Sequence, residues 1–292
     1  MLTDIVRAGL RATAVVSPGL AGRLAFQLWR RPLMRGRVRE VEREVHEAAR
    51  IEIVDGVVTY AWGDGSRPVL LVHGWRSRAS RYYALVARLL ELGYSPVSYD
   101  APGHGDTPGP TGTILDHQRI IRFLEAKHGP FEGMVAYSIG VLFGLYAVRE
   151  GVAAKWIVTI SGIAQFDYLV DKFCRELRLD PAVQPALRRT IERQLFQGDR
   201  EIWTKFSVGV GEIGLLAVHN DEDDVVDPDQ ADHLLAQYGP KATLLRTTGL
   251  GHHRIVSDTD VIEEAVTFLT AASPTASSGS VIPLSGQWSH GS

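Results

Sequence analysis

From about residue 51 onward, apolar runs of strand length alternate with longer segments of helical periodicity. The strand-like runs are 51–54, 57–62, 68–72, 97–99, 133–137, 156–160, 213–218 and 243–246. The helix-like segments are 80–92, 114–128, 139–150, 229–238 and 258–269. Runs such as 68–72 are apolar throughout, as expected of strands buried on both faces. This alternation predicts an α/β fold with a mostly parallel sheet and helices on both of its faces.

The alternation is interrupted once, after the sixth strand run. Residues 166–206 are mostly helical in their periodicity, and Phe166, Leu169, Val170 and Phe173 share one apolar face. We expect this insertion, about 165–207, to form a helical cap over the sheet.

Three regions follow from these patterns. We expect a helical arm over 1–50, a single α/β domain over 51–270, and a tail over 271–292. The tail is rich in Ser, Gly and Pro and poor in large apolar residues, so we expect it to be disordered. Within the domain, Asp55-Gly56 between two strand runs predicts a tight hairpin.

The motif at the end of the 133–137 run carries the strongest functional signal. The pentamer Ala136-Tyr137-Ser138-Ile139-Gly140 lies where that run meets the helical segment that follows it. This setting is typical of a nucleophile elbow, in which a sharp turn exposes a serine hydroxyl for attack on a carbonyl. A serine at a helix start is also a common N-cap, so the pentamer alone leaves both interpretations open.

Further polar residues follow other strand runs. Ligands of parallel α/β sheets bind beyond the carboxyl ends of the strands. The segments at these ends are His73-Gly74-Trp75, Asp100-Ala101-Pro102-Gly103-His104-Gly105, the acidic loop 219–224 and Gly249-Leu250-Gly251-His252-His253. A serine, a carboxylate and a histidine therefore each follow a different strand, in the chain order Ser–Asp–His.

Together these motifs resemble the α/β-hydrolase superfamily over about 51–269, most of the chain. The narrower likeness is to bacterial serine hydrolases with HGW, DAPGHG, an elbow serine, an HxxxD acid loop and GLGH. The resemblance implies an α/β-hydrolase fold, with the cap inserted after the sixth strand, and a catalytic triad that needs no cofactor or metal. It does not define the substrate, because this fold carries many chemistries.

The resemblance assigns the triad residue by residue. Ser138 aligns with the nucleophile and His252 with the general base that takes its proton. The acid of the family lies four residues after a histidine equivalent to His219, which is Asp223 here. Asp224 is the alternative acid in the same loop.

The resemblance also implies an oxyanion hole made of the backbone N–H groups of Trp75 and Ile139. The Trp75 side chain would instead wall the acyl pocket. The chain departs from the family pattern at three positions. Ala136 replaces the first elbow glycine, Tyr137 stands where histidine or serine is common, and Asp227 stands where proline is common.

The other histidines are expected to be structural. The family pattern places His73 and His104 near the pocket, bonded to backbone. Adjacent His252 and His253 point in different directions, and no HExxH-type spacing is present. We therefore expect no catalytic metal site.

The arm differs in charge from the rest of the chain. Residues 1–40 contain eight arginines and two acidic residues, whereas the whole chain has a net charge of −3. One interpretation is an amphipathic peripheral anchor at an anionic membrane surface. The interpretation we favour is helices packed against the main domain or against a partner subunit. The sequence does not define the oligomeric state.

Composition excludes some classes of function. The chain has 292 residues, 45% hydrophobic and 22% charged, which is ordinary for a soluble globular protein and predicts no nucleic-acid partner. We expect no membrane-spanning helix and no signal peptide. The single cysteine, Cys174, excludes an internal disulfide and agrees with an expected cytoplasmic location.

We therefore expect a carboxylesterase- or thioesterase-like serine hydrolase (EC 3.1 class) that acts on a small-molecule acyl ester or thioester. Two alternatives remain open. A closed cap could deliver an alcohol or amine in place of water, which would make the protein an acyltransferase or cyclase. The fold could also serve as a non-catalytic scaffold.

Overall fold

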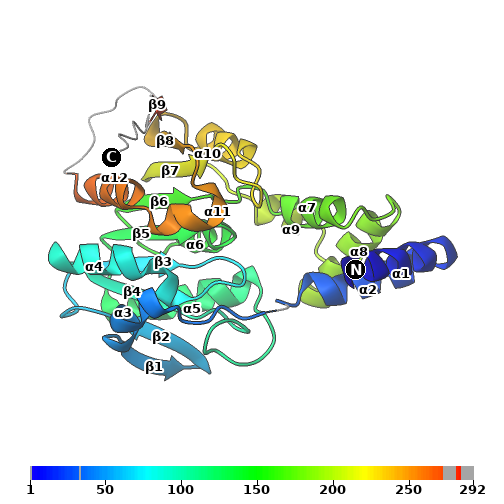
Figure 1. Cartoon of the computed structure of the whole chain (residues 1–292), viewed down its shortest axis with the longest axis horizontal. Helices are drawn as coiled ribbons and strands as arrows, with labels where there is room; N and C mark the ends of the chain where they lie inside the picture. Colours follow the sequence, from blue (N-terminus) through cyan, green and yellow to red (C-terminus); the bar gives the residue numbers. More distant parts are fainter. Residues whose placement is uncertain (1, 33, 272–280, 284–292) are drawn as a thin grey trace, which may run out of the picture.

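The computed structural model describes residues 2–32, 34–271 and 281–283, and a nine-stranded sheet lies at its centre (Figure 1). The strands are β1 (Arg50–Val54), β2 (Val57–Ala61), β3 (Pro68–Val72), β4 (Ser95–Tyr99), β5 (Gly133–Tyr137), β6 (Trp156–Ile160), β7 (Gly214–Asn220), β8 (Ala242–Thr247) and β9 (Val281–Pro283). Their order is β1-β2-β4-β3-β5-β6-β7-β8-β9. β2 is antiparallel to β1 and β4, and all other pairs are parallel. The predicted mostly parallel sheet is confirmed.

Helices cover both faces of this sheet (Figure 1). The helices of the described chain, which include those of a separate lobe, are α1 (Leu2–Val16), α2 (Pro18–Trp29), α3 (Arg43–Glu47), α4 (Tyr83–Glu91), α5 (Ile114–His128), α6 (Gly140–Arg149), α7 (Tyr168–Glu176), α8 (Val183–Leu195), α9 (Ile202–Lys205), α10 (Asp229–Tyr238), α11 (Gly251–Arg254) and α12 (Thr259–Thr270). One apolar cluster joins α5, α6 and α10 to the sheet. A second cluster joins α4 and α12 to it.

Strand β5 contributes side chains to both apolar clusters. Side chains alternate between the two faces of a strand. Met134 and Ala136 accordingly belong to the first cluster, whereas Val135 and Tyr137 belong to the second. Since both faces are buried, the strand is apolar along its length, which is why it could be recognised in the sequence.

The predicted hairpin is also confirmed. Val54 pairs with Val57 across the turn between β1 and β2. Asp55 and Gly56 both adopt positive φ, 49° and 76°. These are the backbone angles that a two-residue type I′ turn requires, and Asp-Gly tolerates them.

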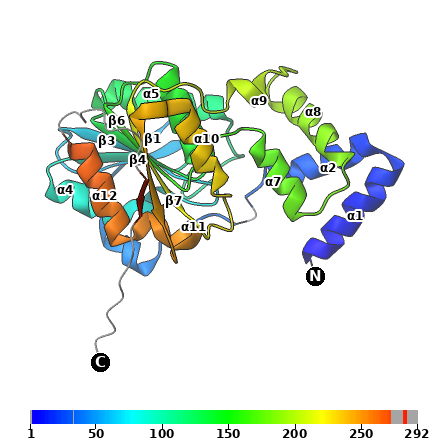
Figure 2. The same ribbon diagram turned by 90° about the horizontal axis from the view of Figure 1, so that it is seen from above.

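The arm and the cap form one lobe beside the sheet (Figures 1 and 2). Helices α7, α8 and α9 lie between β6 and β7, where the helical cap was predicted. Helix α2 packs against α8, and α1 packs against α2. Both views place these arm helices against the cap helices.

The contact between α2 and α8 depends on a small residue. A Cβ atom on Gly22 of α2 would lie 2.6 Å from the carbonyl carbon of Ala186 in α8, so only glycine allows this approach. Beside it, Phe26 belongs to the same buried cluster as Val183 and Leu187 of α8. The arm therefore shares a hydrophobic core with the cap.

No helix among the described residues has the length and apolar character needed to cross a bilayer.

The C-terminal segment differs in part from the expectation. In the segment expected to be a disordered tail, residues 281–283 form β9, a strand that the sequence did not predict. Residues 272–280 and 284–292 of that segment lie outside the described residues.

Candidate active site

Ser138 lies on a sharp turn between β5 and α6, as the elbow motif predicts. Its φ is +58°, a left-handed conformation that residues with a Cβ atom rarely adopt. Its amide donates a hydrogen bond to the Ile160 carbonyl at 3.0 Å, and its own carbonyl accepts one from Val141 at 3.1 Å. The serine side of the turn is thus fixed to the end of β6 and to the first turn of α6.

Two glycines allow the surrounding backbone to approach this turn. A Cβ atom on Gly74 would lie 2.7 Å from the Ser138 Cβ atom. A Cβ atom on Gly140 would lie 2.4 Å from the Val72 carbonyl oxygen at the end of β3. The loop after β3 is therefore pressed against the elbow.

That packing brings the two predicted oxyanion-hole residues to the elbow. Trp75 directly follows Gly74, and Ile139 directly follows Ser138. In the described part of the chain, neither of their amides donates a hydrogen bond. Two unpaired N–H groups beside a serine are what an oxyanion hole requires.

The predicted histidine and acid meet as a buried pair. His252 lies on the single-turn helix α11, and its Nδ1 is 2.9 Å from Oδ2 of Asp223 in the loop after β7. The His252 side chain is 4% exposed and the Asp223 side chain is fully buried. A carboxylate at Nδ1 fixes the tautomer that leaves Nε2 free to accept a proton.

The acid loop is shaped around Asp223. Its Oδ1 accepts hydrogen bonds from the amides of Val225 at 2.9 Å and Val226 at 2.8 Å. Burial by itself raises the pKa of the Asp223 carboxyl, but the His252 hydrogen bond and the Val226 amide outweigh it and hold the pKa below its usual value. Asp224, the alternative acid, is exposed and makes no contact with His252 through its carboxylate.

Asp227, the departure from the family pattern, connects the acid loop to the cap. Its carboxylate bonds to Lys172 of α7 at 2.7 Å and to Arg175 of the same helix. Its amide donates to the Tyr168 hydroxyl at 2.9 Å. A proline at this position would lack both the carboxylate and the amide hydrogen, so these contacts depend on the aspartate.

Tyr137 contributes a support that the sequence did not reveal. Its ring lies 4.9 Å from the His252 ring, and its hydroxyl donates to the His252 carbonyl at 3.0 Å. The residue before Ser138 therefore contacts the loop that carries His252. Its unusual identity within the elbow motif was the available signal, but nothing in the motif named the partner.

His73 makes backbone contacts of the expected structural kind. His73 Nε2 accepts from the Ala101 amide at 2.9 Å, so its Nδ1 carries the proton that it donates to the Gly74 carbonyl at 2.8 Å. Burial, reinforced by His104, lowers the pKa of His73 to about 4. Burial also lowers the pKa of His104, whose Nδ1 is 3.1 Å from the Pro102 carbonyl. Neither ring is hydrogen-bonded to Ser138.

A cavity of about 250 Å³ opens at Ser138. The sheet side of its lining includes Trp75, Ser138, Ile139 and Phe143. The cap and the acid loop add a mostly apolar wall that consists of Ile163, Phe166, Tyr168, Leu169, Lys172, Phe173, Glu176, Leu195, Phe196, Val225 and Val226. Trp75 therefore lines the cavity at Ser138, the place expected for its side chain.

The arm also lines this cavity, which the sequence did not predict. Trp29 and Arg30, at the end of α2, line it together with Thr111. The Thr111 hydroxyl donates to the Arg30 carbonyl at 2.7 Å and fixes the end of the arm to the loop after β4. The arm is thus part of the site and not only a support for the cap.

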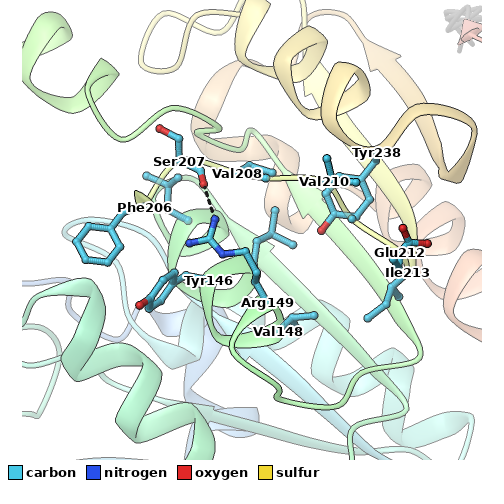
Figure 3. Close-up of a pocket in the computed structure, with 14 residues that line it drawn as sticks. Tyr146, Val148, Arg149, Phe206, Ser207, Val208, Val210, Glu212, Ile213 and Tyr238 are labelled. Atoms are coloured by element: carbon cyan, nitrogen blue, oxygen red, sulfur yellow. Dashed lines mark hydrogen bonds between the residues drawn. The ribbon is translucent and has the colours of Figure 1, made fainter. Parts of the chain in front are cut away.

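Figure 3 shows a different cavity, also of about 250 Å³, between α6, the 206–213 segment and α10. Arg149 crosses it and donates to the Ser207 carbonyl at 3.1 Å. None of Ser138, Asp223 and His252 lines this cavity. It therefore lies apart from the candidate site.

No group of three or more His, Cys, Asp or Glu side chains in the described ranges is arranged to hold a metal ion. His253 lies beside His252, with ring centroids 5.3 Å apart.

Comparison with known sequences gives the family. The sequence model of the alpha/beta hydrolase family matches residues 69–268, well over half of the chain. The chain therefore belongs to the alpha/beta hydrolase family. A search of the curated proteins finds no significant match.

Solved structures share the fold at low identity. An esterase from Rhodococcus sp. ECU1013 is 19% identical, with a TM-score of 0.54 over 77% of this chain and 99% of that chain. A monoacylglycerol lipase from Paleococcus ferrophilus is 20% identical, with a TM-score of 0.55 over 73% and 98%. An esterase from Exiguobacterium antarcticum is 17% identical, with a TM-score of 0.53 over 76% and 98%. At these identities the similarities concern the fold alone.

Proposed function

We propose that this protein hydrolyses a carboxylic ester or thioester through an acyl-enzyme on Ser138. The observation that carries the proposal is the left-handed Ser138 at the mouth of an apolar cavity, with φ +58°. A serine that is only an N-cap has extended backbone, so this conformation favours the nucleophile over the cap. The buried His252–Asp223 pair supports the same assignment.

The proposed reaction has two halves. Ser138 Oγ attacks the carbonyl carbon while His252 Nε2 takes the hydroxyl proton, and the Trp75 and Ile139 amides stabilise the oxyanion. His252 then gives the proton to the departing alcohol or thiol, which leaves an acyl group on Ser138. Water attacks this acyl group with His252 again as base, and the carboxylic acid is released. Asp223 stabilises the charged imidazole in both halves.

The lining of the cavity supports an apolar acyl group of medium size. Phe166, Leu169 and Phe173 of the cap segment face the same space as Ser138. Apolar pockets with few polar groups bind ligands mainly by burying apolar surface. We therefore propose a small-molecule acyl substrate, and a cytoplasmic location stays a prediction from the sequence.

The test is covalent labelling combined with turnover. A fluorophosphonate probe should modify Ser138, and p-nitrophenyl esters from acetate to decanoate should be hydrolysed with an optimum at intermediate length. Ser138→Ala should remove both the adduct and turnover, by a factor of about 10⁴ or more, with an unchanged circular dichroism spectrum. Ser95, a buried serine of β4 that bonds to Gly65 and Asp64, is the control, because Ser95→Ala should still be labelled on Ser138.

Other outcomes would overturn the proposal. Equal activity in Ser138→Ala would exclude this nucleophile. No adduct and no turnover would favour the scaffold alternative. Turnover in H₂¹⁸O should place ¹⁸O in the acid, and its absence would favour an acyltransferase or cyclase.

A further inference from the structure

Two cavities that each contain several arginines in their lining lie beside the cavity at Ser138. The first, about 410 Å³, shares Arg30 and Thr111 with the catalytic cavity. The second, about 990 Å³, shares Arg35 with the first. We call these two cavities the arginine channel, and its arginines are Arg30, Arg31, Arg35, Arg37, Arg76 and Arg78. The arginine channel therefore adjoins the Ser138 cavity at Arg30 and Thr111.

The positive charge of the channel is largely uncompensated. No carboxylate within the described ranges lies at ion-pair distance from Arg31, Arg35, Arg37 or Arg76. Elsewhere arginines often are paired, as Arg88 is with Glu263 at 2.7 Å. The lack of acidic partners is therefore a feature of the arginines in the channel and not of the arginines of the chain in general.

The acidic groups near the channel are already engaged. Asp106, the only carboxylate in its described lining, is 2.6 Å from Arg78 and accepts from the Tyr60 hydroxyl at 3.0 Å. Asp100 lies behind it, fully buried, 3.2 Å from Arg78. Arg78 itself is 3% exposed, and its Nε has no hydrogen-bond partner. The Arg78 Nε is therefore a buried donor for which the described residues supply no acceptor.

The backbone holds the arginines in place. A Cβ atom on Gly36 would lie 3.0 Å from the Arg76 carbonyl oxygen and 3.2 Å from the Ser77 carbonyl carbon. The arm segment is therefore pressed against the turn after β3. Arg76 has a φ of +57°, which fixes the direction of that turn. Arg35 and Arg37, on either side of Gly36, are brought beside Arg76 by this contact.

Phosphate is the ligand that such a cluster recognises best. Guanidinium groups bind phosphate oxygens through paired, charge-assisted hydrogen bonds, and a phosphate supplies more charge than a carboxylate. We propose that the alcohol or thiol half of the substrate carries phosphate and that the arginine channel binds it. This inference rests on the proposed function. The acyl half would lie in the apolar cavity, with the carbonyl at Ser138 and the phosphorylated half passing Arg30 and Thr111.

Phosphate could enter the channel as part of a soluble thiol or of a lipid headgroup. Two matched substrate pairs separate these sources. The thioester pair is hexanoyl-coenzyme A and hexanoyl-N-acetylcysteamine, which lacks phosphate. The oxygen-ester pair is 1-hexanoylglycerol 3-phosphate and 1-hexanoylglycerol. For the pair that matches the true source, the wild-type kcat/KM should be at least tenfold higher for the phosphorylated member.

The same substrates should be tested on a channel variant, Arg35→Gln/Arg37→Gln/Arg76→Gln. These exposed side chains make no described ion pair, so folding should persist. The variant should lose the preference for the phosphorylated member, mainly through KM, and keep its activity on p-nitrophenyl hexanoate. The control is Arg189→Gln/Arg193→Gln/Arg200→Gln, which removes the same charge from exposed positions of the cap region and should keep the preference.

A binding measurement separates this inference from the proposed function. Calorimetric titration of Ser138→Ala with inorganic pyrophosphate should show binding that the channel variant loses and the control keeps. Pyrophosphate binding without any ester turnover would retain the channel and overturn the hydrolase. Ester turnover with no preference for a phosphorylated member, or an equal preference in the channel variant, would overturn the phosphate inference.

Discussion

Ser138 keeps a backbone conformation that costs about 1–3 kcal/mol for a residue with a side chain. Its amide is fixed to Ile160 and its carbonyl to Val141 and Ile163. Gly74 and Gly140 let neighbouring backbone close around it. Local strain is therefore held by contacts from three different strands or their ends, and the serine hydroxyl is presented in a fixed direction.

The acid assignment gives a prediction at this scale. Asp223→Asn should lower kcat on p-nitrophenyl esters by about 10³–10⁴-fold, because an amide at Nδ1 no longer enforces the required imidazole tautomer. Asp224→Asn is the matched control and should change kcat less than about threefold, since its carboxylate is exposed. A larger loss in the Asp224 variant would move the acid by one residue.

Tyr137 provides a second prediction. Tyr137→Phe keeps the ring against His252 but removes the hydroxyl that bonds its carbonyl. Loss of about 1 kcal/mol of positioning should reduce kcat several-fold and leave KM nearly unchanged. Tyr94→Phe is the control, because no described residue accepts a hydrogen bond from the Tyr94 hydroxyl. An unchanged kcat in Tyr137→Phe would mean that the tyrosine supports the fold alone.

Sequence motifs could predict the residues of the candidate triad but not the main-chain contacts that support them. The family resemblance assigned Ser138, Asp223 and His252 to a triad, with Asp224 as the alternative acid. The structure brings Asp223 and His252 together. The Tyr137–His252 contact spans 115 positions and involves a main-chain carbonyl. No side-chain pattern encodes a main-chain acceptor, so this contact could not be predicted.

At the scale of elements, the best predictions concern elements buried on one or both faces. The predicted segments 114–128, 133–137, 156–160 and 229–238 match α5, β5, β6 and α10 at both ends. The single turn of α11 was missed, because four residues are too few to show a helical period. The favoured interpretation placed the arm helices against the main domain or a partner subunit, and α2 packs against α8 in the cap of that domain. The particular partner helix was not predicted, since amphipathic periodicity reveals an apolar face but not its partner.

The arm–cap contact gives the element-scale prediction. Gly22→Ala places a methyl group 2.6–2.7 Å from Ala186, so α2 must shift away from α8. The arm should become more sensitive to proteolysis, and KM for esters should rise because Trp29 moves. Gly9→Ala is the control, since nothing lies within 4 Å of that position and alanine favours the helix. Unchanged proteolysis and KM in Gly22→Ala would show that the contact is dispensable.

For the whole molecule, buried histidines predict a stability that depends on pH. Burial lowers the pKa values of His73, His104, His117 and His219 in the folded state, that of His73 to about 4. The unfolded chain therefore binds more protons between the ordinary histidine pKa of about 6.5 and the lowered values. The free energy of unfolding is greatest above about pH 7 and falls as the pH drops through this window.

The size of this effect can be measured by urea denaturation at pH 7.5 and pH 5. His73 alone should contribute a loss of about 1–2 kcal/mol over this interval. His73→Gln should reduce the pH dependence by a similar amount, whereas His233→Gln, at an exposed position, should leave it unchanged. Equal stability of the wild type at both pH values would contradict the neutral, buried state of these rings.

The walls of the cavity at Ser138 come from two parts of the chain, one inside and one outside the stretch matched by the family model. The match covers 69–268, which includes the elbow, the cap and the acid and histidine loops. Trp29 and Arg30, which close one side of the same cavity, lie outside it. Relatives that share only the matched stretch can therefore keep the proposed reacting groups and still differ in the shape of the substrate cavity. Changes confined to α2 could redirect such an enzyme to a new substrate while every reacting group stays the same.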